Sequence, residues 1–368
     1  MHFLILRLAV SYFRNPLRGI KALAIIKEKR NKIQGLGQVS RFISSGNRYF
    51  FADNIPGWPS KAFTNQFRSE IRRTIPESFG KIPPTTIFIA ITSRCPLRCT
   101  HCYEWENLSQ KETLSIEQLR LIVGKVKDYG ISHIQLSGGE PLMRVDDLTE
   151  LIRLSAGSAD VWINTSGFGL TREIARKLKE AGLTGAEISL DHWNELDHNA
   201  FRGHPESFSW VREAAKNCLQ EGILTSLSLC ATPDFVTKVN LERYTELALG
   251  WGVSFLRLLE VRKTSRFKGK ESKLSSEHIS LLEEFYLDSQ SSGKDPNYPI
   301  IAYPGYHQRR TGCMGAGNRY FYIDPKGDIH ACPFCRGVTG NAITDTLEDT
   351  IRTLKKKGCH VFQSNPEG

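Results

Sequence analysis

Short apolar runs alternate with amphipathic stretches along the middle of the chain, from residue 85 to residue 260. The apolar runs have the length of strands and are rich in Ile, Leu and Val, so we predict buried strands near 86–92, 131–136, 160–164, 185–190, 223–230 and 253–259. The stretches between them have helical periodicity, near 115–129, 146–155, 171–181, 206–221 and 237–250. Repeated strand–helix units predict a parallel sheet with right-handed crossovers. The predicted fold class is α/β, with a partial (β/α)6 barrel of the TIM type.

The segments on either side of this barrel have a mixed pattern. Before it we predict a short strand over 47–53, a turn over 55–60 and a helix over 61–74. After it we predict a mobile basic loop over 263–273, a helix over 276–288, a linker over 293–299, and a pair of strands over 320–323 and 328–331. The predicted division is a basic, helical N-terminal region (1–81), the barrel (82–262), a linker with its helix (263–299) and a small C-terminal α+β domain (300–368).

Three cysteines follow the first predicted strand directly. Cys95, Cys99 and Cys102 have the spacing C-x3-C-x2-C in the run CPLRCTHC. Thiolates that leave a strand at this spacing can face one point, which suits an iron–sulfur cubane with three protein ligands and one open iron. The alternatives are a structural zinc site, which usually has paired knuckles and a fourth ligand, or unrelated thiols.

A second motif narrows this choice. The second predicted strand ends in Ser137-Gly138-Gly139-Glu140-Pro141, where glycines permit close backbone approach and an acid can hold an ammonium group. CPLRCTHC followed by SGGEP resembles the signature of the radical S-adenosylmethionine (SAM) superfamily. The resemblance implies a 4Fe-4S cluster on Cys95, Cys99 and Cys102, whose fourth iron binds SAM, and contact of Gly138, Gly139 and Glu140 with the SAM amine. It also implies reductive cleavage of SAM to methionine and a 5'-deoxyadenosyl radical, which abstracts hydrogen from the substrate.

Further SAM contacts are expected where the third and fourth strands end, because barrel enzymes place their chemistry at the carboxyl ends of strands. The stretch SLDHWNELDHNAFRG resembles the SLDG...HD..RG segment of radical SAM enzymes that act on peptides. It implies SAM contacts from Ser189 and Arg202, with Asn164 and Asp191 as further candidates. His192 replaces the usual glycine, which puts the local backbone in doubt. His101, before the third cysteine, stands where the family contacts adenine. The alternative for these residues is ordinary loop and turn chemistry.

A second set of cysteines lies near the C-terminus. Cys313 precedes the predicted strand pair, and Cys332 and Cys335 follow it in the run CPFC. The pair of strands brings Cys313 and Cys332 close together. The pattern resembles the opening of the SPASM/Twitch extension of radical SAM enzymes, and the shorter Twitch form fits better. It implies one auxiliary iron–sulfur cluster, with Cys359 either as the last ligand or as a plain thiol. The alternative is a zinc ribbon on the same four cysteines.

Charge and composition add little to this picture except at the N-terminus. The chain has 368 residues, nine cysteines and a formal net charge of +10. The cysteines favour a reducing compartment such as the cytoplasm, and no RNA-binding motif is evident, so nucleic acid is not an expected partner. Residues 1–37 are basic and amphipathic, which predicts either peripheral contact with an anionic membrane or a helix packed on the barrel. Their apolar run is too short to span a bilayer and lacks the start of an export signal.

The expected function is therefore a radical SAM enzyme that receives electrons from a reducing partner such as a flavodoxin or ferredoxin. One hypothesis for the substrate is a peptide or protein. The other is a membrane lipid or another amphiphile, and a non-enzymatic zinc-binding protein is a third alternative. Glu260 and Arg262, after the sixth strand, either bind substrate or form a surface salt bridge.

Overall fold

The computed structural model describes residues 10, 16–34, 41–74, 82–267, 273–291 and 294–359. Several expectations fall in part outside these residues. They concern the basic segment 1–37, the mobile loop 263–273, the linker 293–299 and the C-terminal tail after residue 359. The described part of the first of these is the helix α2 (Pro16–Gln34).

The core of the molecule is a sheet of ten strands. The six predicted strands are confirmed as β3 (Thr86–Ala90), β4 (His133–Ser137), β5 (Asp160–Thr165), β6 (Gly185–Ser189), β7 (Leu224–Ala231) and β8 (Phe255–Glu260), each parallel to the next. Two further parallel strands flank them, β9 (Ile300–Ala302) beside β8 and β10 (Tyr320–Ile323) beside β3. The antiparallel strands β11 (Asp328–His330) and β12 (Gly340–Asn341) follow β10. The C-terminal hairpin therefore extends the barrel sheet at β3.

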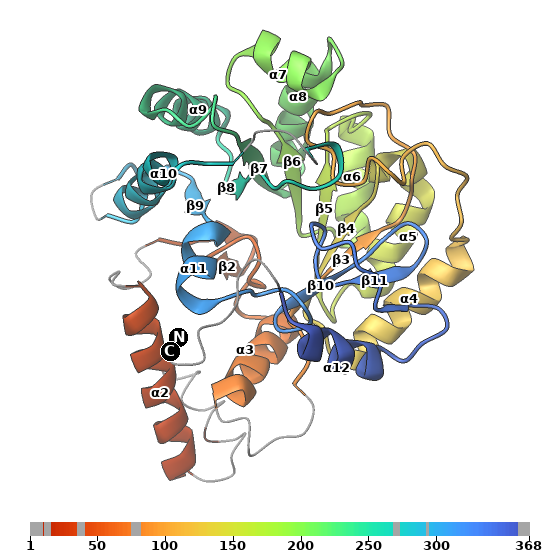
Figure 1. Ribbon diagram of the computed structural model, residues 1–368, viewed down its shortest axis with the longest axis vertical. Helices are drawn as coiled ribbons and strands as arrows, with labels where there is room; N and C mark the ends of the chain where they lie inside the picture. The colour runs from red at the N-terminus through yellow and green to blue at the C-terminus, as the bar shows by residue number, and fades with distance from the viewer. Residues whose placement is uncertain are drawn as a thin grey trace.

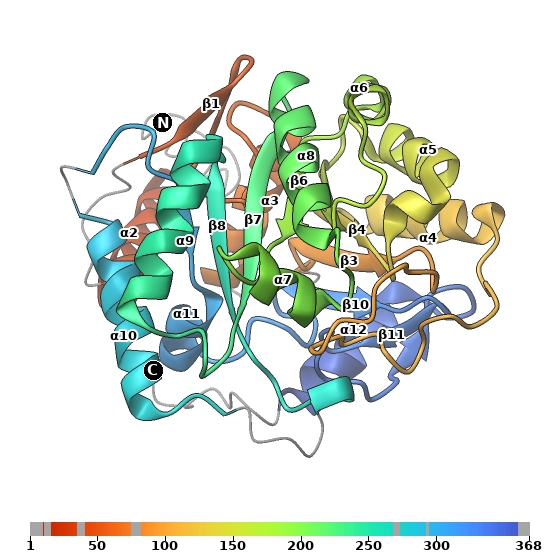
Figure 2. The ribbon, with the colours of Figure 1, turned by 90° about the horizontal axis from the view of Figure 1, so that it is seen from above.

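Helices cover the outer face of this sheet (Figures 1 and 2). The predicted helices are confirmed as α4 (Ile116–Tyr129), α5 (Val145–Ser155), α6 (Arg172–Ala181), α8 (Ser207–Gln220) and α9 (Lys238–Trp251). Their ends follow local capping rules. At α4, Ser115 and Gln118 form a capping box, and Gly130 ends the helix at φ 92°. Within the barrel, the helix α7 (Glu195–Arg202) was not predicted; it lies between β6 and α8 and begins at the N-cap Asn194.

The N-terminal segment closes the end of the barrel where the parallel strands begin. It forms the hairpin β1 (Ile43–Ser45) and β2 (Arg48–Phe50), followed by α3 (Lys61–Thr74). Phe50 packs in a buried cluster with Trp162, Leu224, Phe255 and Ile300, all from β5, β7, β8 or β9. Arg48 Nη1 lies 2.6 Å from Asp160 Oδ1 at the start of β5. With this end closed, only the carboxyl ends of the strands remain for chemistry.

The remaining elements are two short 3-10 helices, η2 (Pro141–Arg144) and η3 (Ser265–Phe267), and three longer helices. Of these, α10 (Ser276–Ser289) was predicted, whereas α11 (Pro304–Thr311) and α12 (Leu347–Lys357) were not. The helix α2 contacts α3 and α11 (Figure 1). Among the described residues, no helix has the length and apolar character needed to cross a bilayer. The division into four domains stays a prediction.

Candidate active site and cysteine centres

The three cysteines of CPLRCTHC line one cavity at the carboxyl ends of the strands. The cavity has a volume of about 160 Å³. Its wall also contains the candidates that the sequence placed at four different strand ends, namely His101, Gly138, Gly139, Asn164, Ser189, Asp191 and Arg202. The structure thus brings together every predicted SAM contact except Glu140, which does not line this cavity.

The thiols of this triad are buried close to one another. Burial raises the pKa of Cys95 and of Cys102 to about 12, and the neighbouring cysteines contribute in the same direction. Burial also raises the pKa of Cys99, although Arg202 opposes this shift with Nη1 at 3.7 Å from the Cys99 sulfur. Three buried thiolates are stable only beside a positive centre. The donor set therefore fits a metal group that needs soft anionic ligands.

The helix α7 holds the cysteine loop from the other side. Arg98 N and Thr100 N donate to the carbonyls of Arg202 and Phe201, at 3.2 and 3.0 Å. The His101 ring stacks on Phe201, with ring centroids 4.8 Å apart, and burial lowers the His101 pKa to about 4. The imidazole is therefore neutral at physiological pH and presents a flat, uncharged face.

Arg202 and Asp191 form a buried ion pair beside the triad. Arg202 Nε lies 2.6 Å from Asp191 Oδ2, and Asp191 Oδ1 accepts a hydrogen bond from Cys230 N at 3.0 Å. Burial opposes ionisation of Asp191, but the Arg202 charge outweighs it and lowers the pKa of that carboxyl. The pair stays ionised and places the guanidinium between Asp191 and Cys99.

The two glycines after β4 allow its backbone to approach the cysteine loop. Gly139 N donates to Thr92 O and Glu140 N donates to Arg94 O, both at 2.8 Å. A Cβ on Gly139 would lie 2.3 Å from Arg94 O, and a Cβ on Gly138, which has a φ of 154°, would lie 2.6 Å from Thr92 O. Only glycine fits here, and the close approach fixes the loop that begins the cysteine motif.

Glu140 has a structural task of its own. Its carboxylate accepts hydrogen bonds from Thr165 Oγ1 at 2.7 Å, Ser166 N at 2.7 Å, Ser166 Oγ at 2.5 Å and Leu142 N at 3.2 Å. These bonds join the end of β4 to the end of β5. The contact of Glu140 with the SAM amine stays a prediction, and the structure shows that its oxygens already hold two strand ends together.

We expect Gly139→Ala to destabilise this region strongly, because the new methyl group would overlap the Arg94 carbonyl. The midpoint of thermal unfolding should fall, and the visible absorbance of any bound cluster should be lost. Gly124→Ala in α4 is the matched control, since a Cβ there meets no atom within 4 Å. Alanine is preferred over glycine in a helix by about 1 kcal/mol, so the control should be neutral or stabilising. Equal midpoints for both variants would contradict the close-approach interpretation.

A larger cavity adjoins the first. Its volume is about 1080 Å³. The two cavities share wall residues, among them Tyr103, Asn164, Glu187, Glu260, Arg262 and Phe334. Glu260 and Arg262 therefore face the interior space, as the sequence suggested. Glu260 accepts a hydrogen bond from Tyr303 at 2.7 Å and pairs with Arg309 and Arg262.

Whereas the first cysteine set lines the smaller cavity, the second set lines this larger one. Cys313, Cys332, Cys335 and Cys359 all lie on its wall, so the structure gathers Cys359 with the other three. The backbones of Cys332 and Cys335 pair with each other as a single antiparallel β-bridge, and no disulfide joins the two residues. Gly315 N donates a hydrogen bond to the Cys313 sulfur at 3.3 Å. Burial raises the pKa of Cys313 to about 12, with Cys359 adding to the shift. Like the triad, this set consists of thiols that can act as soft anionic ligands once they lose their protons.

Among the described residues, no group of three or more His, Cys, Asp or Glu side chains is placed to hold a single metal ion. A tetrahedral zinc site needs sulfurs about 2.3 Å from one centre. Ligands of a cluster bind different iron atoms and stand farther apart.

Sequence reasoning missed a buried charge group between the two cavities. Arg257 from β8 contacts Asp53 Oδ1 at 2.7 Å through Nη2, and Glu187 Oε2 at 2.7 Å through Nε. Both carboxylates line the larger cavity. Burial raises the Glu187 pKa, although the Arg257 charge opposes it. The sequence signal for this group was one charged residue inside each of two apolar strands, Glu187 in β6 and Arg257 in β8. The alternation of apolar and polar positions along a strand does not by itself explain a charge there.

Comparison with known proteins agrees with these features. Residues 89–248 match the family described as the radical SAM superfamily. The chain is 31% identical over 215 residues to an Fe-coproporphyrin III synthase of Methanosarcina barkeri (strain Fusaro / DSM 804), covering 56% of this chain and 50% of that protein. It therefore spans about half the length of that relative.

A further relative and a solved structure cover more of the chain. The mycofactocin maturase MftC of Mycolicibacterium smegmatis is 27% identical over 277 residues, which is 72% of this chain and 69% of the maturase. A crystal structure of Streptococcus suis SuiB bound to the precursor peptide SuiA superposes with a TM-score of 0.60 at 15% identity, covering 93% of this chain and 77% of SuiB. At this identity the superposition shows a shared fold.

Proposed function

Because residues 89–248 are a radical SAM domain, we propose that the protein is a radical SAM enzyme that modifies a peptide. The observation that carries this proposal is the single cavity that holds Cys95, Cys99 and Cys102 together with Gly138 and Gly139. Bound there, a 4Fe-4S cluster and SAM supply reductive cleavage of SAM to methionine and a 5'-deoxyadenosyl radical, which takes a hydrogen atom from the substrate.

The chain's own residues prepare this chemistry. Cys95, Cys99 and Cys102 would hold the cluster, and Gly138 and Gly139, which pack against the cysteine loop, form the part of the wall that would face SAM. Asn164 Oδ1 is buried without a hydrogen-bond partner on the cavity wall, and a SAM donor group would satisfy it. Ser189 lies on the same wall, and the neutral His101 ring offers a surface for adenine. Asp191 and Arg202 act as a pair, because each neutralises the other.

We propose a second cluster on Cys313, Cys332, Cys335 and Cys359. Anaerobically reconstituted protein should then contain roughly seven to eight irons per chain if both sites hold four-iron clusters. It should also form 5'-deoxyadenosine when SAM and dithionite are added. Replacing Cys313, Cys332 and Cys335 by alanine should halve the iron content and leave this reaction in place. Unchanged iron, or bound zinc in its stead, would contradict the second cluster.

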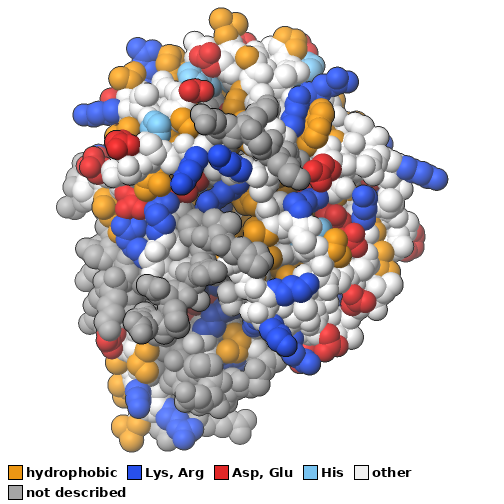
Figure 3. Space-filling model, viewed as in Figure 1, with side chains coloured by type: hydrophobic (Ala, Val, Ile, Leu, Met, Phe, Trp, Pro, Cys, Tyr) orange, Lys and Arg blue, Asp and Glu red, His pale blue; other side chains and the backbone are white. Residues whose placement is uncertain are grey.

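The larger cavity is the proposed substrate site. It is lined by the second cysteine set and shares wall residues with the cavity of the first, and its volume of about 1080 Å³ would accept several residues of a peptide. SuiB, which shares the fold, has been crystallised with a precursor peptide. Basic residues outnumber acidic ones on the wall, and its carboxylates are paired with arginines. Figure 3 shows Lys and Arg side chains over the region of β9 and α11. This charge favours a peptide with acidic residues.

A lipid or another amphiphile is the second candidate. It is favoured by α2, where Leu17 and Ile20 are exposed beside Arg18 and Lys21. Flotation with anionic vesicles of the full chain, compared with a chain lacking residues 1–37, separates the two candidates. Peptide modification predicts no difference in flotation. The proposed setting is a reducing compartment such as the cytoplasm, which the nine free cysteines support, with a flavodoxin or ferredoxin as electron donor.

A further inference from the structure

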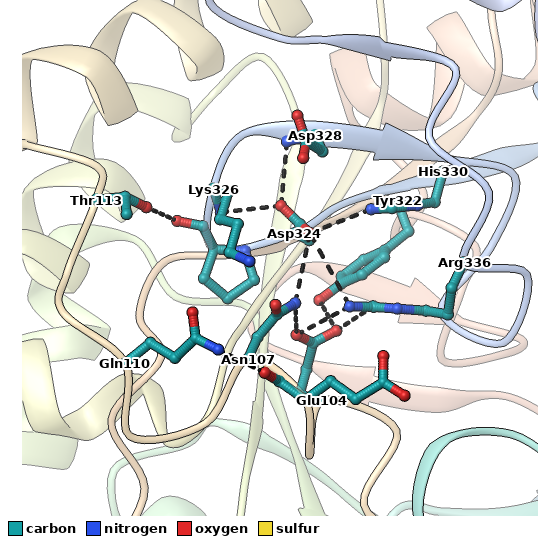
Figure 4. A network of polar contacts seen from close by, with 12 residues as sticks. Glu104, Asn107, Gln110, Thr113, Tyr322, Asp324, Lys326, Asp328, His330 and Arg336 are labelled. Atoms are coloured by element: carbon teal, nitrogen blue, oxygen red, sulfur yellow. Dashed lines mark hydrogen bonds and ion pairs between the residues drawn. The ribbon is translucent and has the colours of Figure 1, made fainter. Parts of the chain in front are cut away.

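A network of buried polar groups joins the loop of the first cysteine set to the loop of the second (Figure 4). At its centre is the Glu104 carboxylate, whose residue is 1% exposed. Glu104 Oε1 accepts hydrogen bonds from Tyr322 Oη at 2.5 Å and from Arg336 Nη1, and Oε2 accepts one from Asn107 Nδ2 at 2.8 Å. Both oxygens of this carboxylate are therefore engaged.

A second buried carboxylate extends the network into the C-terminal hairpin. Asp324 Oδ1 accepts hydrogen bonds from Lys326 N at 2.9 Å and Asp328 N at 3.1 Å. Asp324 Oδ2 lies 3.2 Å from His330 Nε2 and 3.9 Å from Arg336 Nη2. The Arg336 guanidinium thus lies between two carboxylates that come from different parts of the chain.

The ends of this network are next to the cysteines. Glu104 is two residues beyond Cys102, on the loop that leaves the first cysteine set. Arg336 directly follows Cys335. Beside the polar contacts, the Tyr103 ring meets the Phe334 ring edge to face, with centroids 6.1 Å apart, and both residues line the larger cavity. The contact between the loops is therefore both polar and apolar.

Such a network is costly for stability alone. Burying a carboxylate and a guanidinium requires desolvation that well-packed apolar side chains would avoid. What a fully satisfied polar network does provide is one defined geometry. The groups around the ligands of an iron–sulfur centre also help to set its reduction potential. A group that fixes the loop after Cys102 therefore acts on the first cysteine set from a distance.

We propose that Glu104 and Arg336 are positioning residues, which hold the loops of the two cysteine sets in a fixed arrangement relative to each other. This inference rests on the proposed function. It assigns a role to two residues outside both cysteine sets. A change at Arg336, beside the C-terminal set, should consequently alter the properties of the metal group on Cys95, Cys99 and Cys102.

The test compares the variants Arg336→Gln and Arg336→Lys in anaerobically reconstituted full-length protein. In Arg336→Gln we expect the electron paramagnetic resonance signal and the midpoint potential of the triad-held cluster to change, because the loop that carries Cys102 loses its charged contact with the C-terminal loop. Arg336→Lys keeps the charge and should restore much of the wild-type signal. Arg310→Gln removes another arginine, bound to Glu283 and outside this network, and should leave the signal unchanged. A wild-type signal and potential in Arg336→Gln with full iron content would overturn the proposal.

A second measurement keeps the test independent of the metal. Before reconstitution, hydrogen exchange of residues 99–108 should be roughly tenfold faster or more in Arg336→Gln than in the wild type, because a charged hydrogen bond across the loops is lost. If Arg336→Gln fails to fold, Glu104→Gln, which keeps the side-chain shape, is measured in the same way. Unchanged hydrogen exchange of residues 99–108 would overturn the proposal that Arg336 and Glu104 position this loop. Absence of 5'-deoxyadenosine from the wild type would instead contradict the proposed function.

Discussion

Replacing Cys95, Cys99 and Cys102 together by alanine is expected to abolish the formation of 5'-deoxyadenosine from SAM. The three thiols line one cavity, and in the absence of a metal their burial holds the pKa values of Cys95 and Cys102 near 12. Without these ligands no metal group can be held there, so reductive cleavage should fall to the background rate of SAM with dithionite. The measurement is chromatography of the products after anaerobic reconstitution.

The matched control is Cys218→Ala. Cys218 is a buried thiol in α8 that lines neither cavity. This variant should retain the wild-type iron content and rate, with only the small loss of stability that a shortened core side chain produces. The triple variant should keep the iron of the second cysteine set. Formation of 5'-deoxyadenosine by the triple variant at the wild-type rate would refute the assignment of the site.

Arg257→Met is expected to cause the largest loss of stability. It would leave Asp53 and Glu187, which are 1% and 4% exposed, without their shared cation. Breaking a buried ion pair by removing one partner typically costs about 3–5 kcal/mol. Urea unfolding of the anaerobic protein, followed by tryptophan fluorescence, measures the free energy of unfolding. Asp53 also ties the N-terminal segment to β8, so that segment should become more accessible to proteases.

The pH dependence gives this prediction a sign. Burial already raises the Glu187 pKa in the folded protein, and loss of Arg257 would raise it further. A carboxyl whose folded-state pKa is raised binds more protons in the folded than in the unfolded state, so stability falls as pH rises. The difference between wild type and variant in the free energy of unfolding should be largest at neutral pH. It should shrink as the pH falls toward 4.5, the ordinary pKa of a glutamate carboxyl.

The control for this variant is Arg172→Met. Arg172 pairs with Glu221 at 2.7 Å, but its side chain is 68% exposed. An exposed ion pair contributes about 0–1 kcal/mol, so this variant should unfold almost as the wild type does. Equal losses in the two variants would show that the buried group contributes no more than a surface pair.

Periodicity predicted the barrel because each strand and helix there is long enough to show its own pattern. The strands β3 to β8 and the helices between them were found within a few residues. The helix α7 was missed because its eight residues lie in a polar stretch whose Asp191, His192 and Arg202 resembled a loop motif. The strand β9 has only three residues, and its place in the sheet depends on pairing with β8.

The sequence by itself determined the chemistry of short segments. The spacing of Cys95, Cys99 and Cys102, the glycine pair after β4 and the run CPFC each act within a few residues, so their meaning can be read locally. The closeness of the two glycines to the cysteine loop also follows from the strand order, since β3 and β4 are neighbours.

Only the tertiary structure decided which distant groups meet. Arg257 and Asp53 are 204 residues apart, and Arg336 and Glu104 are 232 residues apart. No local pattern encodes such pairs, because a charged residue has the same sequence signal whether water or a buried partner neutralises it. Folding decides between the two by removing the water. The sequence thus pointed to the cysteine and glycine motifs, while the structure showed the cavities and the buried charges beside them.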